Sequence, residues 1–220
     1  MPLIIKIDRA GTGTRPYNDI RKMIAIIDYG TGNLRSVAKA FEFLGHQVIV
    51  TSDPEEIDKC DKLVLPGVGA FGDCMSYLKK GGLDLLVLGW IESGRPYLGI
   101  CLGMQILFER SSEMGEHEGL GIIKGDVVRF SGNVKVPQIG WNMVNFNDRA
   151  AFQAKDGYYY FVHSYYCRPQ DTSVVLAQTN YGGDYCSAIV KDNVLAVQFH
   201  PEKSSSIGLD LLDKFARGYK

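Results

Sequence analysis

From residue 23 onward, short apolar runs alternate with stretches in which apolar residues recur every three or four positions. The first run, 24–28, is rich in β-branched residues and leads into the turn-forming sequence YGTGN at 29–33. Four apolar residues then follow at helical spacing: Leu34, Val37, Phe41 and Leu44. Asn33 is a suitable N-cap for this helix and Gly45 a suitable end. The pattern therefore predicts a strand followed by a helix.

The same alternation continues through the first half of the chain. Further strands are predicted at 46–51, 62–65 and 97–100, and further helices at 73–80, 83–93 and 102–110. Strands that alternate with helices usually form a parallel sheet covered on both faces. We therefore expect an α/β fold of three layers, in which helices flank a mostly parallel central sheet.

The second half of the chain is richer in strands. The predicted elements are strands near 121–130, 141–146, 158–166 and 173–179, a hairpin of 187–190 with 194–199, and a closing amphipathic helix at 204–217. The dipeptide Asp192-Asn193 is a suitable two-residue turn for the hairpin. We therefore expect additional antiparallel strands in the C-terminal half.

Composition and charge narrow the class of protein. The chain has 220 residues, of which 45% are hydrophobic and 22% are charged, as in an ordinary folded domain. The formal net charge of -1 lacks the basic excess that binding to nucleic acid or to an anionic membrane usually needs. No apolar run approaches the roughly 18 residues that cross a bilayer. We expect no nucleic acid and no membrane among the partners.

The charge is unevenly distributed along the chain. Residues 1–22 carry five basic and two acidic residues, a formal charge of +3, which leaves 19 basic and 23 acidic residues, or -4, for 23–220. We therefore expect an N-terminal extension at 1–22 and one domain at 23–220. For the extension, a leader, a misplaced start and an extra strand formed by PLIIKID stay open.

Five cysteines are spread along the chain: Cys60, Cys74, Cys101, Cys167 and Cys186. Their number is odd, no CxxC pair occurs and no secretory signal precedes them, so neither a disulfide framework nor a zinc site is expected. The interpretation is a cytoplasmic protein that binds no metal.

One cysteine stands out by its surroundings. The segment GICLG at 99–103 has the form G-x-nucleophile-x-G at a predicted strand-to-helix junction. Flanking glycines permit the sharp turn that exposes a nucleophile, and the start of a helix favours the reactive thiolate. Cys101 is therefore the candidate nucleophile. The other four cysteines are explained as small packing residues.

A thiol nucleophile in acyl transfer needs a base that can also protonate the leaving group. Of the four histidines, His46 opens a predicted strand and His117 lies in a polar segment, so both are expected at the surface. His200 ends the hairpin, and Glu202, two positions on, would point to the same side of an extended chain. Alone, such a segment could be a simple surface turn. Together with Cys101 it forms a candidate catalytic triad.

Acyl transfer also needs donors for the oxyanion. The backbone N–H of Leu102 and one from the loop Gly67-Val68-Gly69 are candidates, because glycine lets the backbone approach a substrate closely. The glycine-rich loop is not a phosphate loop, since no GK[ST] follows it.

Together, these motifs resemble a known family. GICLGMQ (99–105), PGVGAFG (66–72) and FHPEKS (199–204) resemble the triad-type (class I) glutamine amidotransferases. DYGTGN (28–33), GWN (140–142) and YYYFVHSYY (158–166) narrow the resemblance to the glutaminase subunits of imidazole glycerol phosphate synthases, in histidine biosynthesis. The resemblance covers 23–220 and has no counterpart for 1–22.

The resemblance implies roles for individual residues and no cofactor. Cys101 would attack the side-chain amide of glutamine, His200 would protonate departing ammonia and later activate water, and Glu202 would orient His200. Val68 and Leu102 would form the oxyanion hole. Six further residues fall where relatives hold glutamine: Gly69, Gln105, Glu113, His163, Ser164 and Tyr165.

The resemblance also implies a partner. In the family, ammonia passes to a cyclase subunit with a (β/α)8 barrel, which makes imidazole glycerol phosphate and an aminoimidazole carboxamide ribotide, so a heterodimer is expected. Four residues fall in the motifs that face it: Asn33, Trp141, Tyr160 and Lys203. Three alternatives stay open, namely a glutaminase for anthranilate or aminodeoxychorismate synthesis, a thiol hydrolase outside the family, and a binding subunit without chemistry.

Overall fold

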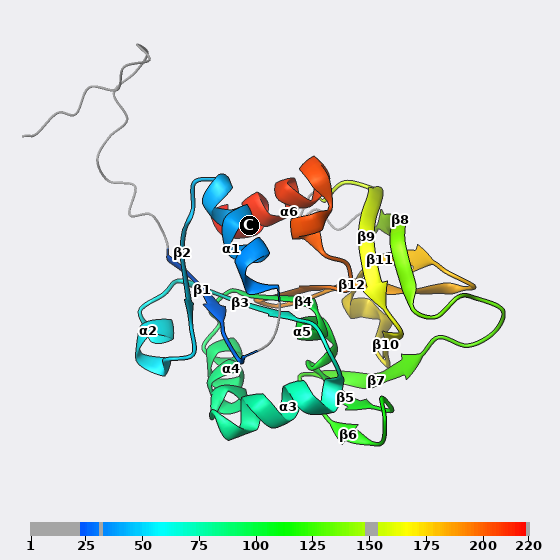
Figure 1. Cartoon of the computed structure of the whole chain (residues 1–220), viewed down its shortest axis with the longest axis horizontal. Helices are drawn as coiled ribbons and strands as arrows, with labels where there is room; N and C mark the ends of the chain where they lie inside the picture. The colour runs from blue at the N-terminus through cyan, green and yellow to red at the C-terminus, as the bar shows by residue number, and fades with distance from the viewer. Residues whose placement is uncertain (1–22, 31–32, 148–153, 219–220) are drawn as a thin grey trace, which may run out of the picture.

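A computed structural model of the chain describes residues 23–30, 33–147 and 154–218 (Figure 1). The expected extension at 1–22 lies outside the described residues, as do positions 31 and 32 of the predicted loop. The structure therefore does not bear on the role of the extension.

Five strands form the parallel half of the sheet: β1 (Met23–Ile27), β2 (Gln47–Thr51), β3 (Lys62–Gly67), β4 (Tyr97–Cys101) and β13 (Val194–Val197). They lie in the order β2-β1-β3-β4-β13, and every neighbouring pair is parallel. Alternate residues of β1 enter different cores, with Ala25 and Ile27 on one face and Ile24 and Ile26 on the other. Apolar residues on both faces are typical of a strand covered by helices on both sides.

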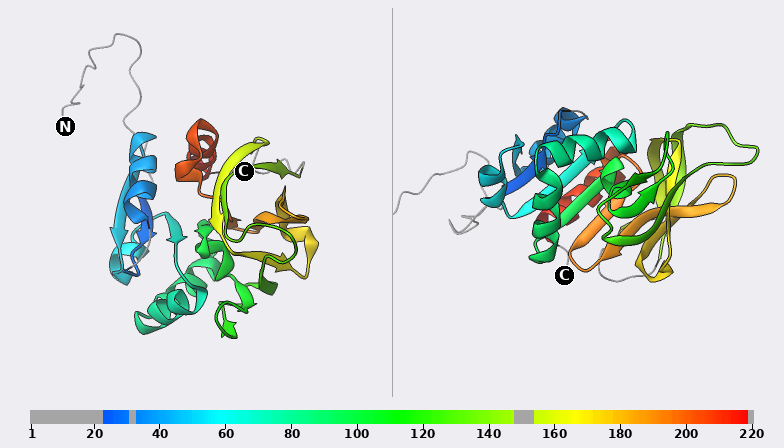
Figure 2. Two further views of the ribbon diagram at one scale, coloured as in Figure 1. Left: turned by 45° about the vertical axis from the view of Figure 1, so that its right-hand side comes forward. Right: turned by 90° about the horizontal axis from the view of Figure 1, so that it is seen from below.

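Helices cover both faces of this parallel half (Figures 1 and 2). The main helices are α1 (Leu34–Phe43), α2 (Pro54–Asp58), α3 (Phe71–Lys80), α4 (Leu83–Glu92) and α6 (Ser205–Arg217). Phe41 of α1 and Phe215 of α6 are buried in one core, whereas Phe71 of α3 and Trp90 of α4 are buried in the other. The predicted three-layer α/β fold is confirmed.

The rest of the sheet is largely antiparallel. Its strands are β5 (Phe108–Ser111), β6 (His117–Glu118), β7 (Ile123–Arg129), β8 (Gln138–Phe146), β9 (Gly157–His163), β10 (Tyr165–Pro169), β11 (Val175–Asn180) and β12 (Asp184–Lys191), with a short 3-10 helix η1 (Thr172–Val174). β12 and β13 form the predicted hairpin, in which Lys191 faces Val194 and Asp192 takes a positive φ of 51°. The hairpin joins the parallel and antiparallel halves.

Two expectations for the elements were wrong, and one α-helix was missed. The helix expected at 102–110 is the single turn α5 (Leu102–Gln105), and β5 follows it. The run Ile106, Leu107 and Phe108 is completely buried, and such a run does not distinguish a strand from a helix by its periodicity. The strand expected at 158–166 is divided at Ser164 into β9 and β10, and α2 was not expected at all.

Candidate active site

Cys101 is the last residue of β4 and directly precedes α5. Its φ of 55° is uncommon for a residue other than glycine and marks the sharp turn. A Cβ atom on Gly99 would collide with the carbonyl oxygen of Gly103, and one on Gly103 with that of Leu65. The two glycines of the motif therefore allow α5 to start directly against the sheet.

The carboxyl ends of three neighbouring strands meet at this turn. β4 lies between β3 and β13, and Gly67 at the end of β3 is in register with Cys101. β13 ends at Val197, and His200 follows it by three residues. In open α/β sheets, sites lie at the carboxyl ends of the strands. The sheet therefore brings the glycine-rich loop, the thiol and the histidine together.

His200 and Glu202 form a buried pair. His200 Nδ1 lies 2.9 Å from Glu202 Oε1, and only 3% and 1% of the two side chains are exposed. We expected an extended chain here, but Pro201–Lys203 is a turn of 3-10 helix, η2, that brings the carboxylate back to the ring. The backbone N–H of His200 donates to the carbonyl of Tyr160 at 2.9 Å, which fixes the pair to β9.

Several neighbours set the protonation of His200. Burial lowers the pKa of its imidazole, but interactions with Cys101 and Glu202 outweigh burial and raise that pKa to about 10. Its other ring nitrogen, Nε2, makes no hydrogen bond of standard geometry within the described chain. Nε2 is therefore the nitrogen available for exchanging a proton with Cys101 and a substrate.

A cavity of about 190 Å³ opens beside the thiol. It is lined by Val68, Gly69, Cys101, Leu102, Gln105, Glu113, Val162, His163, Ser164 and Tyr165. This cavity is thus lined by the expected nucleophile, by both expected oxyanion residues and by all six expected substrate-binding residues. Val162, which the sequence did not indicate, completes the lining.

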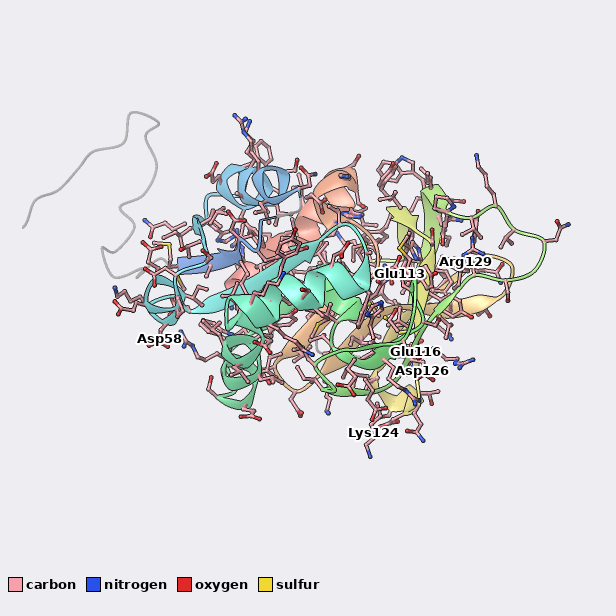
Figure 3. The ribbon with its side chains drawn as sticks, turned by 60° about the horizontal axis from the view of Figure 1, so that its bottom comes forward. Asp58, Glu113, Glu116, Lys124, Asp126 and Arg129 are labelled. Atoms are coloured by element: carbon pink, nitrogen blue, oxygen red, sulfur yellow. The ribbon has the colours of Figure 1, made fainter. Side chains whose placement is uncertain are left out.

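The polar residues of the cavity are held by specific contacts. Glu113 Oε2 accepts a hydrogen bond of 2.7 Å from the backbone N–H of Phe71, so its carboxylate lies at the start of α3 (Figure 3). The carbonyl of Tyr165 accepts from Gln105 Nε2 at 2.9 Å and from His163 Nδ1 at 2.7 Å. This shared acceptor therefore connects Gln105, at the end of α5, to the start of β10.

His163 is a neutral, buried part of this wall. Burial lowers the pKa of its imidazole, the hydrogen bond to the carbonyl of Tyr165 opposes this shift, and nearby His200 adds to it, so that the pKa lies at about 4. Its Nε2 lies 3.3 Å from the hydroxyl of Tyr185, which also donates to Gln138 Oε1 at 3.0 Å. A buried polar network therefore supports the cavity from behind.

Three of the four expected partner-facing residues lie together. Trp141 on β8 is in register with Tyr160 on β9, and their ring centroids are 6.1 Å apart. Lys203 Nζ lies 5.8 Å from the centroid of the Tyr160 ring. Asn33 lies at the start of α1, where its side chain makes no cap to the helix backbone and instead accepts from the Ser36 hydroxyl at 2.7 Å.

Burial shifts the pKa values of the remaining four cysteines. Burial raises the pKa of Cys74 and of Cys186 to about 12, and that of Cys167 well above its usual range. Burial also raises the pKa of Cys60. Across 23–30, 33–147 and 154–218, no group of three or more His, Cys, Asp or Glu side chains could hold a metal ion.

The sequence did not indicate one polar residue that directly contacts Cys101. Gln198, fully buried after β13, donates from Nε2 to Cys101 Sγ at 3.6 Å. It precedes His200 by two residues, and the strand period of two could have placed it on the same side.

The sequence is similar to a known protein family and to individual proteins of known name. Residues 25–217 match the family described as glutamine amidotransferase class-I. An imidazole glycerol phosphate synthase subunit HisH from Syntrophotalea carbinolica is 54% identical over 203 residues, which cover 88% of this chain and 98% of that protein. The subunit of the same name from Aquifex aeolicus is 52% identical over 196 residues, or 87% of this chain and 95% of that protein.

Solved structures agree on the fold. A glutamine amidotransferase crystal structure has a TM-score of 0.70 at 21% identity and covers 88% of this chain and 98% of its own. PurLQS from Thermotoga maritima has a TM-score of 0.68 at 19% identity, with coverages of 90% and 99%. Since the family match extends over residues 25–217 and curated relatives are more than half identical, this chain belongs to the class-I glutamine amidotransferases.

Proposed function

We propose that the chain is the glutaminase subunit of an imidazole glycerol phosphate synthase, in which Cys101, His200 and Glu202 hydrolyse glutamine. The observation that carries the proposal is the position of Cys101, which lines the cavity and also interacts with the buried His200. Relatives named as this subunit, more than half identical over nearly all of their own length, support the choice of synthase. Family membership sets aside a thiol hydrolase of another family.

The first half of the reaction forms a thioester. The Cys101 thiolate attacks the side-chain amide carbon of glutamine, and the carbonyl oxygen takes up the negative charge. When the tetrahedral intermediate collapses, the carbon–nitrogen bond breaks and His200 Nε2 gives its proton to the leaving nitrogen, which departs as ammonia. Glu202, bound to Nδ1, stabilises the imidazolium that exists before this transfer.

The second half regenerates the thiolate. Neutral His200 takes a proton from water as the water oxygen attacks the γ-glutamyl thioester. The carbon–sulfur bond then breaks, glutamate leaves, and Cys101 and His200 return to their starting states. Backbone N–H groups of Val68 and Leu102, both at the cavity, are the proposed donors to the oxyanion in both halves.

The cavity wall supports recognition of an amino acid. Glu113 supplies a carboxylate for the α-ammonium group of glutamine, and Ser164 and Tyr165 supply backbone groups near the break between β9 and β10. Gln105 uses both amide hydrogens within the protein, on Tyr165 and Gln198, so it faces the substrate with its carbonyl oxygen. Gly69, with a φ of 103°, keeps the opposite wall free of side chain.

Ammonia delivery requires a partner, because ammonia released into water at neutral pH becomes ammonium and loses its nucleophilicity. We propose that a cyclase subunit covers the face formed by Trp141, Tyr160 and Lys203, which excludes water from the route. We place the complex in the cytoplasm, since five free thiols suit a reducing compartment and the relatives belong to a biosynthetic synthase. None of the helices in the described ranges is long and apolar enough to span a membrane.

Mixing the purified chain with a cyclase and measuring glutamate release from glutamine tests the function. Glutamate should appear when the cyclase and its ligand are present, and Cys101→Ala should abolish it. Synthesis from added ammonium salts should survive in Cys101→Ala, which shows that the cyclase in the assay is active. Activation by an anthranilate or aminodeoxychorismate synthase partner, and not by the cyclase, would contradict the choice of synthase.

A further inference from the structure

The side chain of Gln198 connects the nucleophile to the wall of the cavity. It is fully buried, and its amide Nε2 lies 3.6 Å from Cys101 Sγ. On its other side, Oε1 accepts from Gln105 Nε2 at 3.1 Å. The backbone N–H of Gln198 donates to the carbonyl of Ser187 at 2.9 Å, which anchors the residue to β12.

The neighbours of Gln198 determine which end of its amide faces the sulfur. Gln105 Nε2 has two hydrogens, one for the carbonyl of Tyr165 and one for Gln198 Oε1. If the Gln198 amide were rotated by half a turn, two NH₂ groups would face each other and an oxygen would face the sulfur. The network therefore directs an N–H group at the thiol.

We propose that Gln198 is a further residue of the reaction, which holds Cys101 Sγ in position and stabilises its thiolate with an amide N–H donor. A hydrogen bond to the charged form of a group favours that form, and a buried thiolate has few water molecules to replace it. The same donor acts on the thiolate that leaves when the thioester is hydrolysed. The inference rests on the proposed role of Cys101 as nucleophile.

Gln198 and His200 reach Cys101 from the same stretch of chain. Gln198 and His200 are two residues apart on the segment after β13, and both side chains interact with Cys101. In extended backbone, residues two apart point to the same side, and His200 has an extended conformation. The segment that follows β13 therefore brings a neutral donor and a titrating base to the same sulfur atom.

The test replaces the donor and measures the thiolate directly. Gln198→Met keeps the length of the side chain without an N–H group, and Gln198→Leu keeps much of its apolar volume. The rate at which iodoacetamide alkylates Cys101 is followed between about pH 5 and pH 10 by mass spectrometry of the Cys101 peptide, since only the thiolate reacts. Gln178→Leu, an exposed glutamine on β11, is the matched control.

We expect the midpoint of alkylation in Gln198→Met to rise by about one pH unit, the size of one hydrogen bond to a charged group. With the cyclase bound, kcat for glutamine should fall about ten-fold while KM changes little. Gln178→Leu should match the parent chain in both measurements. Folded Gln198 variants with the parent midpoint and kcat would overturn the proposal.

Folding of the variants does not limit the test. If thermal melting shows that both Gln198 variants are unfolded, Gln105→Leu removes the group that orients the Gln198 amide and should raise the midpoint by a smaller amount. An unchanged midpoint in that variant would then overturn the proposal. Alkylation requires neither glutamine nor a partner. A parent chain without glutaminase activity, together with a shifted alkylation midpoint in Gln198→Met, would therefore count against the proposed function and not against Gln198.

Discussion

Gly103 packs against the backbone carbonyl of Leu65 so closely that no side chain fits between them. The contact holds the first turn of α5 against β3 and thereby positions Cys101. Gly103→Ala must move backbone against backbone, and we expect it to lower the free energy of unfolding by about 3 kcal/mol or more. Gly89→Ala in the exposed face of α4 meets no atom within 4 Å and should raise it by about 0.5 to 1 kcal/mol. Chemical denaturation of both variants makes the comparison.

Removal of the Cys101 thiol should change the pKa of His200. Burial lowers its pKa while Cys101 and Glu202 raise it, so Cys101→Ala should move the pKa of His200 downward from about 10. Nitrogen-15 NMR of labelled histidine measures the titration, and Glu202→Gln should move it in the same direction. An unaltered titration in both variants would mean that these neighbours do not set the protonation of His200.

Acid should weaken the fold through His163. Its pKa is lowered to about 4 in the folded chain from a usual value of 6.5, so between these values the unfolded chain binds a proton that the folded chain does not. Stability therefore falls as the pH drops from 6.5 towards 4, by about 3 kcal/mol from this residue alone. The parent chain should lose that much more than His163→Gln over this range in urea titrations. Parallel losses would refute the assignment.

The proposed partner face should depend on Trp141. Its side chain is 48% exposed, yet it packs edge-on against Tyr160. Trp141→Ala should weaken binding to the cyclase at least ten-fold, because large aromatic residues at the centre of an interface carry much of the affinity. Leu85→Ala, at a 70% exposed site on α4, should bind like the parent chain. Calorimetric titration measures the affinity of each variant for the cyclase. Equal affinities of Trp141→Ala and the parent chain would mean that the cyclase binds to another face.

Removal of residues 1–22 should leave the enzyme intact. The family match begins at residue 25, and the resemblance of motifs begins at 23. A chain of 23–220 should therefore keep the glutaminase rate and the melting temperature of the full chain. A large fall in either would show that PLIIKID contributes to the fold.

Local patterns were sufficient for the parts of the site that lie close together in the sequence. The glycines at 99 and 103 indicated the turn. The spacing of His200 and Glu202 indicated that their side chains interact, although a 3-10 turn and not an extended chain brings them together. The alternating elements of the first half gave the layers of the fold correctly, because each strand there is bounded by turn-forming residues.

The parts that escaped prediction depend on long-range register. Gln198 contacts Cys101 because β13 lies beside β4, and Val162 lines the cavity close to the junction of β9 and β10. The fully buried run at 106–108, which is the turn after α5 and the first residue of β5, has no polar side to reveal its period, so it was taken for part of a helix. Such choices are decided by tertiary packing.

β13 lies between β4 and β12 in space, yet it follows both in the chain. A ribosome therefore releases Cys101 long before Gln198 and His200, and a growing chain carries its thiol without a base. The parallel half of the sheet is completed only when β13 enters it. On the proposed mechanism, a chain that stops before His200 therefore cannot hydrolyse glutamine.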